Sequence, residues 1–526
     1  MNYNNLDTVD AFSKLKKQKV TDIKAALTKD RVESYMINAG GGFSYNYAAM
    51  PVDDHIIDIL QDLCEEQELV AKYKSLLGGS VINLGEKRQV LHQLLRGSVL
   101  SQRVMVDGED KGQFYANVNQ KIASFSEKIR NGEIKGSTGK PFTTICQIGI
   151  GGSDLGPRAL YLALKGYCTG TNLKQLEGKF ISNVDPDDAA EVLSHLDMET
   201  TLFVLVSKSG TTLETLTNRD LVLSKMRQCN VPGFNPARHF VAVTSKTSPL
   251  ASSHDVLDSF YIDNYIGGRY SATSAVGGVI LSCTFGYEVF EKVLEGAHEV
   301  DVLSLEPDIR KNASMMAAAL GIYLRNILSL PTLAILPYSQ ALSRFPAHLQ
   351  QLAMESNGKH VNRFGEKINY STEPVIFGEP GTNGQHSFYQ LLHQGTDITP
   401  IDFIGFGESQ RGMDGEVEGS TSQQKLVANL VAQIVAFLQG QENDNPNKRF
   451  EGNRYSSLMV AKRLTPKSLG ALLSHYENTV MFQGFLWNIN SFDQEGVQLG
   501  KTLATKVLKG CEGDEVLMAY LKLFHA

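Results

Sequence analysis

The sequence contains few cysteines, and their spacing excludes two common kinds of site. Only six of the 526 residues are cysteine, they are scattered along the chain, and no CxxC pair occurs. The HExxH pattern of many zinc enzymes is also absent. Free thiols in a reducing, cytoplasmic compartment are therefore the expected state. The sequence indicates neither a metal site nor a disulfide framework.

Long apolar runs and an excess of basic residues are missing as well. The longest mainly apolar stretch, residues 426–438, contains the polar residues Asn429 and Gln433 and is too short to span a bilayer. The N-terminus, MNYNNLDTVDAFSKLKK, lacks the layout of a signal peptide. A net charge of −7 and a pI of about 6.0 provide no broad basic surface. We expect a cytoplasmic protein with neither nucleic acid nor membrane as a partner.

What the sequence does contain is an alternation of apolar strands and amphipathic helices. Residues 1 to about 110 show mostly helical periodicity. Beyond about 140, short apolar runs such as TTICQIGI and TLFVLV are separated by amphipathic helical segments, which is typical of a parallel sheet covered on both faces. A second region of the same plan follows after 290. The pattern predicts an α/β protein with two doubly wound parallel-sheet units, each a three-layer αβα arrangement.

One turn between a predicted strand and a predicted helix is unusually rich in hydroxyl groups. The stretch VSKSGTTLET covers residues 206–215. At the carboxyl end of a parallel strand, the N-terminus of the next helix offers free N–H groups and the positive end of its dipole. Helix capping would need only one hydroxyl. We therefore interpret this turn as a binding site for a phosphate monoester, made by Ser207, Lys208, Ser209, Thr211 and Thr212.

A glycine-rich turn follows an earlier predicted strand. The stretch GIGGSDLG, residues 149–156, lets the backbone approach a ligand closely, and Ser153 adds a hydroxyl. It does not match the dinucleotide-binding fingerprint, because Asp154 stands where GxGxxG requires its last glycine. Together, the two turns suggest a ligand held between adjacent strand ends.

Six stretches in chain order resemble the motif set of the phosphoglucose (glucose-6-phosphate) isomerase family. They are GIGGSDLG, SKSGTTLET, IGGRYSATSAVG, MESNGKHV, GEPGTNGQHSFYQLLHQG and FDQEGVQLGK. The resemblance implies two sugar-isomerase (SIS) domains with a helical N-terminal arm and a C-terminal tail. The expected division is an arm over 1–110 that packs on the second domain, SIS domains over 111–290 and 291–510, and a tail over 511–526.

The resemblance also implies a reaction and the residues that perform it. The family interconverts glucose 6-phosphate and fructose 6-phosphate by ring opening and an enediolate, with no metal or organic cofactor. Glu355 in MESNGK matches the family's base, and Arg269 in GGRYS matches the arginine that faces the enediolate. His386 in GQHSF matches the ring-opening histidine, and Lys501 in QLGK matches the lysine that works with it.

Substrate contacts and assembly are implied in the same way. The family acts as a homodimer in which the ring-opening histidine, here His386, is lent to the neighbouring site. The positions that match the family's substrate-binding residues are Gly152, Ser153, Ser207, Lys208, Ser209, Gly210, Thr211, Thr212, Gln351 and Gln494.

The sequence departs from the family pattern at two motifs, and two other functions stay open. Many members read SKTFTT at the phosphate turn, so Gly210 predicts a looser loop here, and Glu495 and Gln498 replace an aromatic and an acidic residue. A non-catalytic SIS sugar-phosphate sensor would keep the hydroxyl turn but would not need all four catalytic positions. An isomerase of another hexose 6-phosphate, such as mannose 6-phosphate, would use the same base.

Overall fold

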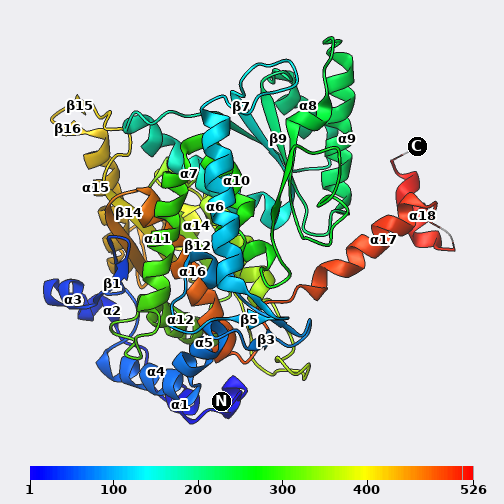
Figure 1. The fold of residues 1–526 in the computed structure, drawn as a ribbon. Coiled ribbons are helices and arrows are strands. Elements are labelled where there is room, and N and C mark those ends of the chain that lie inside the picture. Colours follow the sequence, from blue (N-terminus) through cyan, green and yellow to red (C-terminus); the bar gives the residue numbers. More distant parts are fainter. Residues whose placement is uncertain (512, 525–526) are drawn as a thin grey trace.

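The computed structural model describes residues 1–511 and 513–524, and Figure 1 shows two sheets flanked by helices. The first sheet has the strand order β11-β10-β9-β7-β8, and every pairing in it is parallel. The predicted parallel α/β organisation is confirmed. Its strands are β7 Thr144–Ile148, β8 Glu177–Ile181, β9 Thr201–Val206, β10 Phe240–Thr244 and β11 Asp258–Tyr261.

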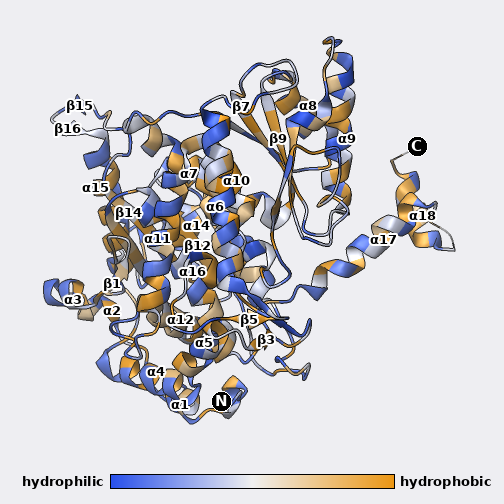
Figure 2. Ribbon diagram, viewed as in Figure 1, coloured by the Kyte–Doolittle hydropathy of each residue, from blue (hydrophilic) through white to orange (hydrophobic). Residues whose placement is uncertain are grey.

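Helices cover both faces of the first sheet because β7, β9 and β10, the three strands at its centre, are buried on both sides. All six residues of β9 are buried. Phe203 and Leu205 pack with α8 and α9, whereas Val204 and Val206 belong to the main core on the opposite face, because successive side chains alternate across a strand. Figure 2 shows β9 in the colour of hydrophobic residues. The helices of this unit are α6 Lys111–Arg130, α7 Leu155–Gly170, α8 Pro186–Ser194, α9 Leu213–Gln228 and α10 Ala275–Phe285.

The second sheet has the order β1-β2-β17-β14-β12-β13 and is parallel from β17 to β13. One face packs on α14 and α15, and the opposite face belongs to the main core with α12 and α16. Its parallel strands are β12 Thr332–Pro337, β13 Val375–Phe377, β14 Ile401–Glu408 and β17 Ser456–Arg463. The helices are α11 Tyr287–Leu303, α12 Ala313–Ile322, α13 Phe345–Gln350, α14 Tyr389–Gln394, α15 Ser422–Gln439 and α16 Pro466–Leu486.

The periodicity predicted a mostly helical N-terminal region, and the structure adds β-strands to these helices. A hairpin of β1 (Met36–Gly40) and β2 (Phe43–Asn46) extends the second sheet by pairing antiparallel with β17. Its turn uses Gly41, whose φ is +59°, because a side chain there would collide with Ala471. The helices here are α1 Asp10–Leu15, α2 Ile23–Ala26, α3 Lys29–Ser34, α4 Asp54–Glu66 and α5 Leu69–Leu77.

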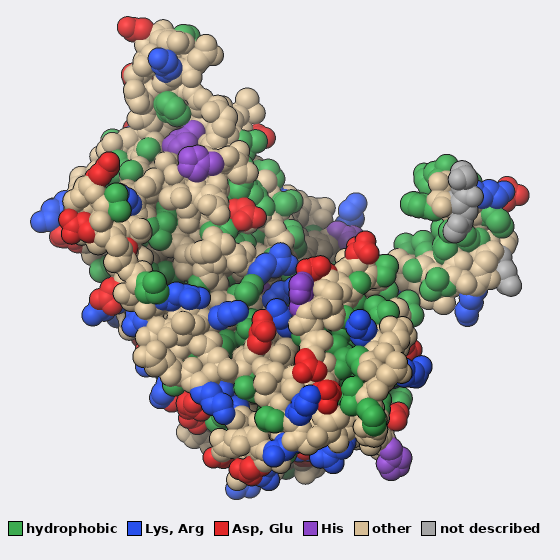
Figure 3. Space-filling view, turned by 90° about the horizontal axis from the view of Figure 1, so that it is seen from above, with side chains coloured by type: hydrophobic (Ala, Val, Ile, Leu, Met, Phe, Trp, Pro, Cys, Tyr) green, Lys and Arg blue, Asp and Glu red, His purple; other side chains and the backbone are tan. Residues whose placement is uncertain are grey.

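Short hairpins and a C-terminal arm complete the described chain. The arm consists of α17 (Gln498–Leu508) and α18 (Glu515–Lys522), neither of which has a buried residue, and it projects from the body (Figure 1). Exposed apolar side chains lie along it (Figure 3). The small hairpins are β3 Val81–Asn83 with β4 Arg88–Gln89, β5 Met105–Val106 with β6 Glu109–Asp110, and β15 Glu416–Val417 with β16 Ser420–Thr421.

The predicted domain limits at 110, 290 and 510 stay predictions. Parts of the predicted tail 511–526, namely residues 512, 525 and 526, lie outside the described residues. Within the described chain, no helix is both long enough and apolar enough to cross a membrane.

Candidate active site

The two turns singled out in the sequence lie side by side at the carboxyl edge of the first sheet. The strands that precede them, β7 and β9, are hydrogen-bonded neighbours. The first turn forms a short 3₁₀ helix, η3 (Gly151–Ser153), before α7, and residues 207–212 connect β9 to α9. Parallel strands end at the same edge of a sheet, so two helix N-termini converge there.

The hydroxyl groups of the 207–212 turn bond to the turn itself and not to the end of α9. Ser207 Oγ accepts a hydrogen bond from the Gly210 amide at 3.1 Å and lies 2.9 Å from Thr212 Oγ1. Ser209 Oγ accepts from the amide and the hydroxyl of Thr211, at 3.2 and 2.9 Å. Among the described residues, no side chain caps α9. Its first N–H groups therefore stay available to an anion, which supports the phosphate interpretation.

Lys208 brings the turn's positive charge into a partly enclosed position. Its Nζ donates to the carbonyl oxygen of Ile266 at 3.3 Å. Burial lowers the pKa of this lysine, and the nearby Arg88 lowers it further, whereas Glu86 raises it. A bound phosphate would favour the charged amine by adding an opposite charge nearby.

Close packing around residue 210 explains why a glycine stands there, and the sequence alone did not show this packing. Its φ is +71°, and a Cβ at this position would lie 2.2 Å from Ser248 Oγ. The turn therefore packs closely against residues 248–250, whereas the sequence suggested only a looser loop. A side chain at Gly210 would have to displace Ser248 as well as adopt a backbone conformation that favours glycine.

Gly152 allows the glycine-rich turn to touch the loop that carries Arg269. A Cβ on Gly152 would lie 2.2 Å from the carbonyl carbon of Gly268 and 2.8 Å from the amide nitrogen of Arg269. Arg269 belongs to the 3₁₀ helix η5 (Gly268–Tyr270). Only glycine at 152 permits this backbone contact, which joins the glycine-rich turn to the loop of the arginine.

We expect Gly152→Ala to destabilise the fold by about 1–3 kcal/mol, because the η5 backbone must move to admit the methyl group. Urea unfolding measures this loss. Gly415→Ala is the matched control, since nothing lies within 4 Å of its added Cβ and its φ is not positive. Equal stability of the two variants would show that the close contact between Gly152 and Gly268 is not required.

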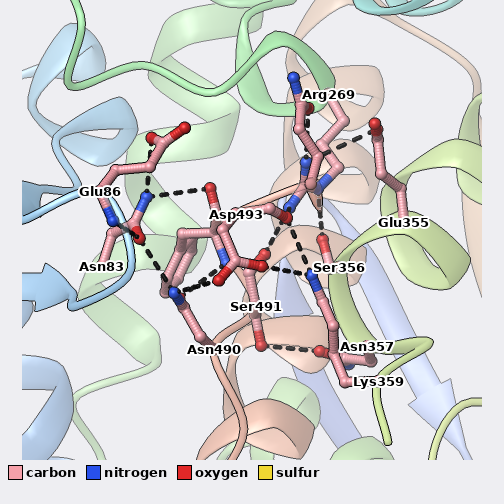
Figure 4. A network of polar contacts seen from close by, with 12 residues as sticks. Asn83, Glu86, Arg269, Glu355, Ser356, Asn357, Lys359, Asn490, Ser491 and Asp493 are labelled. Atoms are coloured by element: carbon pink, nitrogen blue, oxygen red, sulfur yellow. Dashed lines mark hydrogen bonds and ion pairs between the residues drawn. The ribbon is translucent and has the colours of Figure 1, made fainter. Parts of the chain in front are cut away.

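Glu355 and Arg269 face each other at the centre of the site (Figure 4). Glu355 ends a π-helical stretch, η8 (Gln351–Glu355), which continues α13. The Arg269 Nη1 atom lies 3.5 Å from Glu355 Oε2, and the side chains are 1% and 18% exposed. Within the described chain, Glu355 Oε2 is buried and accepts no hydrogen bond. The carboxylate is therefore held beside a permanent cation, and its Oε2 atom is not engaged in a hydrogen bond.

The rest of the Arg269 guanidinium is fixed by the segment before the C-terminal arm. Nη2 donates to the carbonyl oxygens of Ser491 and Asp493, at 2.7 and 2.9 Å. Nε donates to Ser356 Oγ at 2.6 Å, and Nη1 donates to Gln494 Oε1 at 3.2 Å. The structure thus brings the predicted residues Gln494, Arg269 and Glu355 together.

Gln351 links the same helix to the glycine-rich turn. A Cβ on Gly151 would lie 3.4 Å from Gln351 Nε2. Gln351 Oε1 is buried and, among the described residues, has no hydrogen-bond partner. An unsatisfied buried amide oxygen at this place is suited to accept a bond from a ligand hydroxyl.

Two predicted catalytic residues do not join this group within one chain. His386 ends the 3₁₀ helix η9 (Asn383–His386) and is exposed. Lys501 is exposed on α17, the first helix of the projecting arm. Across the described residues, neither side chain forms a hydrogen bond or ion pair with Glu355 or Arg269.

Sequence reasoning missed several polar residues that support the site. Ser356 accepts from Arg269 and lies 3.0 Å from the Tyr270 hydroxyl. Lys359 bonds to Asp493, the residue just before Gln494. Ser356, Lys359 and Asp493 occur inside the quoted motifs MESNGKHV and FDQEGVQLGK. Their place within these motifs was the one feature of the sequence that could have identified them. In residues 1–511 and 513–524, no group of three or more His, Cys, Asp or Glu side chains is placed to hold a metal.

Comparison with known proteins decides the family. The sequence pattern of the phosphoglucose isomerase family matches residues 46–520. The chain belongs to the phosphoglucose isomerase family. It is 57% identical to the glucose-6-phosphate isomerase of Treponema denticola over 97% of both chains. It is 55% identical to that of Treponema pallidum, over 100% of this chain and 98% of the relative.

A solved structure extends this family likeness to three dimensions. The crystal structure of a glucose-6-phosphate isomerase from Chlamydia trachomatis superposes with a TM-score of 0.92 at 43% identity, and the match covers 99% of each chain. The predicted family membership is confirmed.

Proposed function

We propose that this member of the phosphoglucose isomerase family interconverts glucose 6-phosphate and fructose 6-phosphate. The observation that carries the proposal is the pairing of Glu355 with the buried Arg269 beside an uncapped, hydroxyl-rich helix start. An aldose–ketose isomerase that acts on a sugar phosphate needs three parts, namely a base, a fixed cation and a binding site for the phosphate. The sensor alternative would need only the last of them.

The proposed chemistry follows from the positions of these groups. The 207–212 turn and the start of α9 bind the 6-phosphate. Glu355 removes the proton from C2 of the open sugar and returns it to C1, so its carboxylate must reach both carbons. Arg269 stays charged and stabilises the developing enediolate oxygen through its Nη1 edge. No external oxidant or reductant is needed, because C2 is oxidised and C1 is reduced by proton transfers within the same sugar.

We further propose that ring opening uses His386 and Lys501 and that the active protein is a cytoplasmic homodimer serving glycolysis and gluconeogenesis. Exposure of His386, and the absence in the described residues of a hydrogen bond or ion pair between it and Glu355 or Arg269, support a site that is shared between subunits. The proposed domains remain 1–110, 111–290, 291–510 and 511–526.

A coupled assay with purified protein tests the proposed reaction. Fructose 6-phosphate is supplied, and formation of glucose 6-phosphate is recorded through a glucose-6-phosphate dehydrogenase reaction, once with and once without EDTA. We expect turnover that EDTA does not reduce, since acid–base groups of the chain carry every step. Absence of turnover would overturn the proposed function, and mannose 6-phosphate in parallel tests the other hexose alternative.

The phosphate position predicts a specific binding defect. We expect Ser209→Asp to raise KM by about tenfold or more, because it places a carboxylate where the phosphate binds. Ser13→Asp, another exposed serine at a distance from both sheets' turns, is the control for an added charge. Steady-state kinetics with fructose 6-phosphate give both values, and an unchanged KM for Ser209→Asp would place the phosphate elsewhere.

The shared site can be tested with mixed dimers. Glu355→Gln chains and His386→Ala chains are co-expressed with different tags, and dimers that carry both tags are isolated. If each site takes these residues from different chains, a mixed dimer has one doubly defective site and one intact site. About half of the sites in the isolated mixed dimers should then be active, and about a quarter of all sites in the unfractionated mixture, where random pairing makes about half of the dimers mixed. Purified mixed dimers without regained activity would rule out sharing.

A further inference from the structure

Arg269 uses the two edges of its guanidinium for different purposes. The Nη2 edge is occupied by the carbonyl oxygens of Ser491 and Asp493. The Nη1 edge faces Gln494 Oε1 and Glu355 Oε2. Because the group is planar and rigid, the orientation of the edge that faces the base depends on where the two carbonyl oxygens lie. The backbone at 491–493, together with Ser356 at Nε, therefore sets the geometry between Arg269 and Glu355.

That backbone is held in turn by Lys359. Its Nζ donates to the Asp493 carbonyl oxygen at 2.9 Å and to the Asp493 carboxylate at 2.5 Å (Figure 4). Both side chains are 17% exposed, so water screens the pair only in part. The other carboxylate oxygen accepts from Asn490 Nδ2 at 2.6 Å, and Asn490 also donates to Asn83 Oδ1 at 2.9 Å.

One oxygen atom joins this pair to the catalytic arginine. The Asp493 carbonyl accepts from both Lys359 Nζ and Arg269 Nη2, so two cations converge on it. The Asp493 carboxylate supplies the negative charge that makes this convergence favourable. Gln494, which contacts the Nη1 edge, is the next residue along the chain. Movement of Asp493 would therefore shift Arg269 and Gln494 together.

We propose that Lys359 and Asp493 are positioning residues that hold the Nη1 edge of Arg269 and the amide of Gln494 toward Glu355. This inference rests on the proposed isomerase function. Lys359 touches neither Glu355 nor the hydroxyl turn, and it acts through the Asp493 carbonyl. Its loss turns the guanidinium away from the place where enediolate charge develops.

The primary test is Lys359→Met, which removes the charge and keeps the length of the side chain. We expect kcat to fall about 10- to 100-fold while KM changes less than about threefold, because the defect concerns transition-state geometry. Lys359→Arg should recover most of kcat, since its fork can reach both Asp493 oxygens and a groove of about 580 Å³ borders the pair. Lys367→Met, an exposed lysine further along the same segment, is the control.

A double variant separates positioning from a general structural role. If Lys359 acts through Arg269, then adding Lys359→Met to Arg269→Lys should lower kcat by less than about twofold beyond Arg269→Lys alone. Multiplied losses would overturn the proposal. So would a Lys359→Met enzyme with kcat within about twofold of wild type, or a Lys359→Arg enzyme as slow as Lys359→Met.

A crystal structure of Lys359→Met provides a test that needs no activity. We expect a longer separation than 3.5 Å between Arg269 Nη1 and Glu355 Oε2 and displaced carbonyl oxygens at 491 and 493. An unchanged arrangement would overturn the positioning role even in an active enzyme. An inactive wild-type protein, in contrast, would contradict the proposed function. The crystal structure of Lys359→Met would still test whether Lys359 and Asp493 position Arg269.

Discussion

Glu355→Gln should lower kcat about 10²- to 10⁴-fold while the protein still binds the sugar phosphate. The substitution is nearly isosteric and removes the only function assigned to this group, which is to accept and return a proton. Glu355 Oε2 accepts no hydrogen bond in the described chain, and its contact is the ion pair with Arg269 Nη1. Stopped assays with fructose 6-phosphate measure the remaining rate.

Binding and folding controls keep this result specific. Isothermal titration with a five-carbon aldonate phosphate, which resembles the enediolate, should still detect binding to Glu355→Gln. Glu451→Gln, an exposed position, should retain the wild-type rate. A Glu355→Gln enzyme that keeps more than about a tenth of the wild-type kcat would mean that another residue is the base.

Arg269→Lys is expected to lower kcat about 10²- to 10³-fold, although it preserves the charge. A single ammonium cannot donate to Ser491, Asp493 and Gln494 and still face Glu355, as the guanidinium does. Affinity for the enediolate analogue should fall more than affinity for substrate, because the lost contact matters most where charge develops. Inhibition constants for the analogue and KM values for substrate give the comparison.

Stability has to be measured beside activity for this variant. The carbonyl oxygens that Arg269 satisfies are partly or fully buried, so their loss of a donor should cost about 1–3 kcal/mol of unfolding free energy. Rates are therefore referred to folded protein, and Arg411→Lys, at an exposed arginine, serves as the control. Nearly unchanged affinity for the analogue in Arg269→Lys would contradict the role of the fork.

The sequence was informative where one local pattern determines the structure. The uninterrupted apolar run of β9 requires cover on both faces, and this correctly predicted a parallel sheet. The hairpin at 36–46 was missed because its strands are short and a run of glycines separates them. Its pairing partner, β17, lies more than 400 residues away along the chain, so no local sequence pattern predicts the pairing.

In the candidate site, too, the local part could be predicted from the sequence and the contacts between distant segments could not. The 207–212 turn is continuous in sequence, so its relation to a strand end and a helix start could be predicted. The surroundings of Arg269 could not, because Ser491 and Asp493 are 222 and 224 positions away and contribute backbone oxygens. Any residue type presents a carbonyl, so such contacts leave no pattern in the side chains. The resemblance to a family identified Arg269, but only the fold showed how it is held.

Following deuterium from the solvent into the sugar tests the account most directly. The purified protein is incubated with fructose 6-phosphate in D₂O until interconversion reaches equilibrium, and proton NMR spectra of both sugars are recorded. If Glu355 carries the proton between C2 and C1, exchange of its carboxyl proton over many turnovers should place deuterium at C2 of glucose 6-phosphate and at C1 of fructose 6-phosphate. Glu355→Gln should give neither conversion nor label on the same timescale. Complete interconversion by the wild-type protein without deuterium in either sugar would contradict the account, because that result is expected of a direct hydride shift from C2 to C1 and not of a base whose proton exchanges with water.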